Sequence, residues 1–352
     1  MISWPLFTRS GPLGIDIGTK SIKAVQLSAD RSRVVAAHRL ELSAAATEQT
    51  GEQRQATISD ALATLVKQHG LKGCDAVCCL DDQQMFLQNI RIAKNPAETE
   101  RLVAQEIAGR LPFSVEEAEI RYVESADVRQ GETIVREVIV MACKRTHIHA
   151  QAQLLESVGL RPVSIDTQPC ALARGHSRQF RRDVDKSERA LLVHLGHRRS
   201  LAVVAHGDEV LFVKYIDIGG THFDQALARQ LRMELPEATR LRRREGDRRA
   251  DRQDSDVVRA VQEALRAPVD RLCGELGLCT RYHSVMFRGQ SLSRVVVSGG
   301  EATPELAETI GKYLSLETEV CDPVRHLDQG TFRFFRKCQW DLAVGLALRN
   351  VE

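Results

Sequence analysis

The sequence has no long hydrophobic run, and none of its apolar stretches approaches the roughly 18 residues that a membrane-spanning helix requires. Residues 1–12 also lack the apolar core and the small-residue cleavage site of a secretion signal. The nine cysteines are odd in number and form no Cys-x-x-Cys pair, and the eleven histidines are not grouped at metal-ligand spacing. These absences predict a reduced, cytoplasmic protein without a transmembrane segment or a structural zinc site.

The sequence also has no large excess of positive or negative charge. The formal net charge is +2 over 352 residues, so no global field attracts nucleic acid. Arginines crowd residues 239–254, but acidic residues interleave with them, which favours a solvated helix face or loop over a nucleic-acid arm. No Gly-x-Ser-x-Gly nucleophile elbow is present, which argues against a serine hydrolase.

A hairpin-like pattern at residues 13–27 is the most informative segment that the sequence contains. A buried strand ends just after Asp16, and a second apolar strand begins at Ile22. The turn between them offers a glycine for close backbone approach, two hydroxyls, a lysine and backbone amides, all of which suit phosphate oxygens. These turn residues are Gly18, Thr19, Lys20 and Ser21. Asp16 could hold a magnesium ion through water. The pattern predicts a phosphate-binding hairpin, with a purely structural hairpin as the alternative.

The second half of the chain contains a related hairpin pattern. His194 stands 178 positions after Asp16, about half of the chain length, and Gly196 takes the place of Gly18. A hairpin repeated at half-length indicates two related lobes.

A pair of glycines follows a later buried strand. Gly299 and Gly300 come directly after residues 294–298 and precede a helix start, so a flat ring could lie on their backbone. Two phosphate-type hairpins and a strand-Gly-Gly-helix turn together predict an α/β protein with the two-lobed actin-like (ribonuclease H-like) nucleotide-binding fold.

Six motifs resemble those of one family, in the same order along the chain. They are Gly14–Val25, Glu106–Phe113, Ile165-Asp166, Ile218-Gly219-Gly220, Ser298-Gly299-Gly300 and Trp340–Leu348. Over residues 13–350 the sequence resembles the PilM family, the cytoplasmic actin-like proteins of type IV pilus assembly. Each motif alone is a moderate signal, and their shared order is the specific feature.

The resemblance implies that ATP or ADP with magnesium binds in the cleft between the lobes. The implied nucleotide-binding residues are Asp16, which would also approach the metal, Gly18, Thr19, Lys20, Ser21, Gly196, Arg242, Gly299 and Gly300. The sequence departs from the family pattern at two places. His194 stands where a second acidic residue orients metal and water. Thr239 and Arg242 replace a glutamate and a lysine close to the ribose. We therefore expect nucleotide binding with weak or absent hydrolysis, and no catalytic residue.

The resemblance also implies a partner, the short cytoplasmic N-terminal peptide of the inner-membrane protein PilN, in addition to other inner-membrane proteins of the pilus platform. The peptide would bind beside a subdomain inserted at about residues 83–145, along the expected helix 98–110 and the corner after it. The groove residues are expected to be Leu102, Glu106, Leu111, Pro112 and Phe113. Alternatively, Leu111 and Phe113 only close a hydrophobic core. Through this partner the protein would lie at the inner face of the inner membrane.

The expected organisation is a tail at 1–12, a first lobe at 13–175 and a second lobe at 190–352. The run Asn-Pro-Ala-Glu at 95–98 resembles a helix start with asparagine as the cap. Two other functions stay open, an actin-fold ATPase or small-molecule kinase and a division protein like FtsA. The first would need an acidic residue at position 194, and the second normally ends in an amphipathic membrane helix that residues 346–352 do not resemble.

Overall fold

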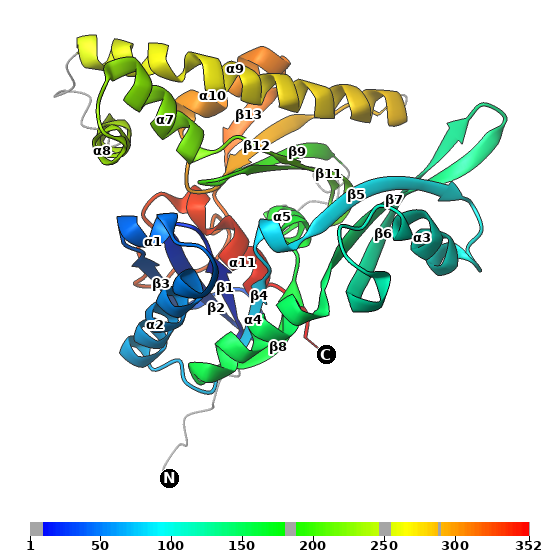
Figure 1. The fold of residues 1–352 in the computed structure, drawn as a ribbon, viewed down its shortest axis with the longest axis horizontal. Helices are drawn as coiled ribbons and strands as arrows, with labels where there is room; N and C mark the ends of the chain where they lie inside the picture. Colours follow the sequence, from blue (N-terminus) through cyan, green and yellow to red (C-terminus); the bar gives the residue numbers. More distant parts are fainter. Residues whose placement is uncertain (1–9, 180–187, 246–254, 288–289, 352) are drawn as a thin grey trace. The chain divides into compact units, whose positions relative to one another are not determined.

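The structure is a computed structural model that describes residues 10–179, 188–245, 255–287 and 290–351. The chain divides into two compact units, whose elements Figure 1 shows as a ribbon coloured along the sequence. Unit 1 comprises Met1–Glu188, Ala205–Val213 and Asp322–Glu352, and unit 2 comprises Arg189–Val204 and Lys214–Cys321. Among the described residues, no helix carries the extended apolar stretch that crossing a membrane demands.

Unit 1 is built on a five-stranded sheet in the order β3-β2-β1-β4-β8. Its strands are β1 (Ser10–Ile17), β2 (Ser21–Ser28), β3 (Val34–Glu41), β4 (Asp75–Cys79) and β8 (Arg161–Asp166). The first three form an antiparallel meander, β4 runs parallel to β1, and β8 runs parallel to β4. Side chains alternate between the faces of β1, so Leu13 and Ile15 share one core with α2 (Gly51–His69) and α4 (Arg145–Ser157).

The other face of this sheet is covered by α11 (Asp341–Ala347), which also packs on α5 (Gln168–Ser177). Gly14 points to α11, and a methyl group on Gly14 would stand 2.2 Å from Ala343 O. The helix therefore lies directly on the strand backbone. Because α11 buries its apolar side chains against β1 and β2, residues 322–352 group with unit 1. The expectation that they close the second lobe is wrong in this respect.

A smaller antiparallel sheet within unit 1 occupies the region expected to be inserted. Its order is β5-β7-β6, with β5 (Phe86–Ala93), β6 (Ala118–Gln130) and β7 (Thr133–Lys144). Helix α3 (Thr99–Ala108) packs Val103 and Ile107 onto this sheet. The helix begins at Thr99, and Asn95 is not its cap, because the Asn95 side-chain amide donates to Glu98 Oε2 at 2.9 Å instead. The other short helices in the described part of unit 1 are α1 (Ala44–Glu48), η1 (Asp82–Gln84), η2 (Val115–Glu117) and η4 (Lys337–Trp340).

A second five-stranded sheet, which belongs to unit 2 except for residues 205–213, repeats the strand arrangement of the large sheet in unit 1. The order is β11-β10-β9-β12-β13, and β12 runs parallel to both of its neighbours. The strands are β9 (Arg189–Leu195), β10 (Ser200–His206), β11 (Glu209–Ile216), β12 (Arg294–Ser298) and β13 (Glu317–Val320). The helices are α7 (Gly220–Leu231), α8 (Leu235–Glu245), α9 (Ser255–Met286) and α10 (Pro304–Leu314). Helix α7 packs on α8 and on the long α9, as Figure 1 shows. The repeated strand order confirms the predicted internal repeat.

Candidate functional site

The first candidate site is the turn between β1 and β2 in unit 1. The hairpin register pairs Ile17 with Ile22, which sets Asp16 opposite Lys23. Lys23 Nζ donates to Asp16 Oδ2 at 2.7 Å, and the two side chains are only 8% and 7% exposed. The Asp16 carboxylate is therefore neutralised inside the protein, and a metal ion at this carboxylate would share it with Lys23.

Lys23 is a site residue that the reasoning from sequence missed. A methyl group on Gly18 would stand 4.0 Å from Lys23 Nζ, so the ammonium group flanks the turn. Two signals could have identified it. A lysine is unusual inside an otherwise apolar strand, and a turn at residues 18–21 puts positions 16 and 23 opposite each other.

The four turn residues differ in how far they are available to a ligand. Gly18 N donates to Ser21 O at 3.0 Å and closes the turn, and Arg54 Nη2 supports it by donating to Gly18 O at 3.3 Å. Thr19 and Lys20 are partly exposed, whereas Ser21 is buried. Of the three polar side chains in the turn, those of Thr19 and Lys20 are the ones accessible from solvent.

The glycines of unit 2 form a second cluster at the ends of β9 and β12. Gly299 has a left-handed backbone (φ 94°), and a methyl group on it would stand 2.5 Å from Leu195 O. A methyl group on Gly196 would stand 2.6 Å from Arg199 O within its own hairpin turn. Both positions therefore require glycine for reasons internal to the fold. Gly300 is different, because open space lies where its side chain would be. The backbone at Gly300 can be approached by a ligand.

Arg242 on α8 is held in a buried ionic network. Its Nε donates to Asp224 Oδ1 at 2.6 Å, its Nη1 lies 2.8 Å from Glu301 Oε2, and the side chain is 11% exposed. His197 Nδ1 lies 3.7 Å from the other Glu301 oxygen. Burial alone would lower the pKa of Arg242, but the carboxylates of Glu301 and Asp224 outweigh it and hold this pKa above its ordinary value. In the structure, Arg242 is a structural cation that binds two protein carboxylates.

The two departures from the family pattern lie in unit 2. His194 is half-buried near the end of β9, where it pairs with Ser298 of β12. The Thr239 hydroxyl donates to Leu235 O within α8, at 3.0 Å.

The described ranges contain no group of three or more histidine, cysteine, aspartate or glutamate residues arranged to hold a metal ion. Residues 239–245 of the arginine-rich segment belong to α8, and residues 246–254 of it lie outside the described residues.

The candidate partner residues lie on and after α3. Leu102 and Leu111 pack, partly buried, against the core of the small sheet, as the alternative interpretation proposed for Leu111. Glu106 forms an ion pair with Arg110 one helical turn later. Pro112 is exposed and Phe113 is half-buried, so these two corner residues are the accessible apolar ones.

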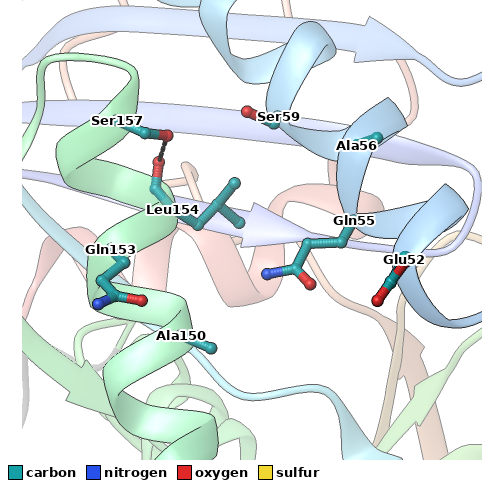
Figure 2. Close-up of a pocket in the computed structure, with 8 residues that line it drawn as sticks. All are labelled: Glu52, Gln55, Ala56, Ser59, Ala150, Gln153, Leu154 and Ser157. Atoms are coloured by element: carbon teal, nitrogen blue, oxygen red, sulfur yellow. Dashed lines mark hydrogen bonds between the residues drawn. The ribbon is translucent and has the colours of Figure 1, made fainter.

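A separate pocket of about 310 Å³ lies between α2 and α4 in unit 1 (Figure 2). Its lining comes from Glu52, Gln55, Ala56 and Ser59 of α2 and from Ala150, Gln153, Leu154 and Ser157 of α4. None of the residues predicted from the sequence lines this pocket.

Residues 14–351 match the family described as "Type IV pilus assembly protein PilM". The chain belongs to the PilM family.

Solved structures resemble this PilM family member over nearly their whole length. A protein solved in a "PilM-PilN type IV pilus biogenesis complex" superposes with a TM-score of 0.78 at 21% identity, covering 97% of this chain and 99% of the other. The ethanolamine utilization protein EutJ from Carboxydothermus hydrogenoformans gives a TM-score of 0.57 at 13% identity, covering 98% and 91%. MreB5 of Spiroplasma citri, solved with ADP, gives 0.52 at 10% identity, covering 96% and 95%. No curated protein matches the chain. The predicted actin-like fold and the PilM resemblance are confirmed.

The structure brings the predicted nucleotide-binding residues of this PilM protein together in two groups, one in each unit. In unit 1, Asp16 and the turn 18–21 lie together and are joined by Lys23. In unit 2, the other predicted nucleotide-binding residues lie around Leu195 and Glu301. These are Gly196, Gly299, Gly300 and, through its ion pair with Glu301, Arg242.

Proposed function

We propose that this chain is an actin-like scaffold of type IV pilus assembly whose main task is to dock the cytoplasmic N-terminal peptide of a PilN-like inner-membrane protein. The observation that carries the proposal is the family match over residues 14–351, together with the likeness to a protein solved in a PilM–PilN complex. Other inner-membrane proteins of the pilus platform are further partners in this proposal. The protein would then work in the cytoplasm, at the inner face of the inner membrane.

The proposed docking surface is the corner after α3, on the small sheet of residues 83–145. Pro112 and Phe113 offer accessible apolar surface there, and Glu106 and Arg110 offer a neighbouring ion pair. A short extended peptide buries little area, so one or two apolar anchors should dominate its affinity. Leu102 and Leu111 support this surface from below, because they pack on the core of the small sheet.

Fluorescence anisotropy with the labelled N-terminal peptide of the PilN-like protein tests this assignment. We expect Phe113→Ala to weaken peptide binding by at least about tenfold with an unchanged melting temperature. Val115→Ala is the matched control, because Val115 is an exposed apolar residue two positions further along. Equal peptide affinity for both variants and the unmodified protein would place the docking site elsewhere.

We propose in addition that ATP or ADP with magnesium binds through the turn of the first hairpin. Thr19 and Lys20 are accessible donors there, and the Lys23 ammonium group, paired with Asp16, lies beside Gly18. Isothermal titration with Mg-ADP should show binding that Lys20→Ala weakens. Lys312→Ala is the charge-matched control, because Lys312 is an exposed lysine on α10. No heat of binding from the unmodified protein would refute this part of the proposal.

Hydrolysis is proposed to be weak or absent, because His194 replaces the second acidic group. We expect turnover well below the usual enzyme range of about 1 to 1,000 per second. His194→Asp should raise any residual rate of phosphate release. An unmodified protein that turns over ATP within that range would instead support the rival ATPase function.

A further inference from the structure

Two arginines of unit 1 form ion pairs with one buried aspartate, and two further arginines belong to the same charged region. Asp166 ends β8, and its side chain is only 2% exposed. Arg349 Nη1 donates to Asp166 Oδ1 at 2.9 Å, and Arg174 Nη1 lies 3.0 Å from Asp166 Oδ2. Each carboxylate oxygen therefore lies within ion-pair distance of one guanidinium group.

Two more arginines join this group, and neither forms an ion pair with a carboxylate among the described residues. Arg31 Nη2 donates to the Arg349 carbonyl at 3.4 Å, from a turn where Arg31 itself has a left-handed backbone (φ 59°). Arg178 is exposed, one helical turn after Arg174, at the end of α5. Burial, followed by repulsion from Arg178 and Arg174, lowers the pKa of Arg31.

Nearby negative charges balance the positive charge of these four arginines only in part. Within the described ranges, Asp166 is the one carboxylate that forms an ion pair with any of the four. The neighbouring Asp30 carboxylate accepts hydrogen bonds from the hydroxyls of Ser28 and Ser32. The carboxyl ends of α5 and α11 each contribute a partial charge of about −0.5 at most. Four guanidinium groups against Asp166, Asp30 and two helix ends leave an excess of about one positive charge.

We propose that this cluster, Arg31, Arg174, Arg178 and Arg349, is a binding site for a phosphate group. Guanidinium groups present planar donor pairs that match phosphate oxygens, and the negative charge of the phosphate offsets the excess positive charge. Arg174 and Arg349 are positioned by Asp166. Arg31, which also donates to the Arg349 carbonyl, and Arg178 supply further donors to the ligand. The phosphate is either that of a small soluble molecule or that of a lipid headgroup.

Thermal melting of the full chain in pyrophosphate, against chloride at equal ionic strength, tests the site. We expect pyrophosphate to raise the melting temperature of the unmodified protein. In Arg31→Ala and Arg178→Ala, the pyrophosphate affinity should fall by about tenfold each, because each loses one charged hydrogen-bonding group. Arg259→Ala is the charge-matched control, since Arg259 is an exposed arginine on α9 of unit 2.

Phosphate binding at the arginine cluster must be distinguished from phosphate binding at the first hairpin. Arg31→Ala and Arg178→Ala should retain the Mg-ADP affinity of the unmodified protein, whereas Lys20→Ala should retain the pyrophosphate effect of the arginine cluster. A pyrophosphate effect that survives in both arginine variants but is lost in Lys20→Ala would overturn the proposal. So would the absence of any melting shift in the unmodified protein.

Flotation with vesicles distinguishes the two sources of phosphate. Vesicles of phosphatidylcholine with phosphatidylglycerol are compared with vesicles of phosphatidylcholine alone. Binding to the anionic vesicles that is lost in the Arg31→Ala and Arg178→Ala variants assigns the site to a lipid headgroup. A pyrophosphate effect without vesicle binding assigns it to a soluble phosphate compound.

Discussion

Replacing Arg242 provides a sharp test of whether this arginine is a structural cation or a ligand-binding residue. Arg242→Met would leave the carboxylates of Asp224 and Glu301, which are 3% and 6% exposed, buried without their common partner. Removing one partner of a buried ion pair costs about 3–5 kcal/mol, because the remaining charge has lost both water and its counterion. A domain of ordinary stability unfolds with about 5–15 kcal/mol, so the loss is a large share of the total.

Urea unfolding followed by far-ultraviolet circular dichroism is the suitable assay. Neither tryptophan belongs to unit 2, so tryptophan fluorescence would not report on it directly. Arg240→Met is the matched control, because Arg240 is exposed on the same helix and its loss should change the free energy of unfolding by no more than about 0.5 kcal/mol. Neutralising the carboxylates as well, with Asp224→Asn and Glu301→Gln, should recover most of the loss. If Arg242→Met behaves like the Arg240→Met control, the buried network is not what stabilises unit 2.

Four further predictions concern packing, pH and thiol reactivity. Gly14→Ala should destabilise unit 1 by about 3 kcal/mol in urea unfolding, because the new methyl group would overlap Ala343 O. Gly274→Ala should stabilise α9 by about 0.5–1 kcal/mol, because open space surrounds this helical glycine. Burial, and then the nearby Arg189, lowers the pKa of His283 to about 4 in the folded protein. Between about pH 6.5 and pH 4, His283 therefore binds a proton in the unfolded chain but not in the folded protein. Stability should fall by roughly 3 kcal/mol at most between about pH 6.5 and pH 4, and a flat profile in that window would contradict the assignment. Burial raises the pKa of Cys78 to about 12, so mass spectrometry should find this thiol unalkylated in the native protein at about pH 8 and alkylated after denaturation.

Local patterns determined the hairpins and the repeat. The apolar strands around the turn 18–21 predicted the first hairpin, because alternation and turn residues act over a few positions. The same pattern at position 194 predicted the second sheet, and the strand order of both sheets confirms it. Even the pairing of Asp16 with Lys23 follows from hairpin register, although it was missed.

The order of the motifs along the chain was by itself enough to predict that the protein belongs to the PilM family. What the sequence could not decide was which surfaces distant segments would bury. α11 lies near the C-terminus yet packs on β1, because its apolar face fits a strand that presents Gly14. Arg242 meets Glu301 across many intervening residues, and Arg31 meets Arg349 across almost the whole chain. Burial and ion pairing depend on distances in space, so only the tertiary structure could show that Arg242 is bound internally and that four separate arginines form one cluster.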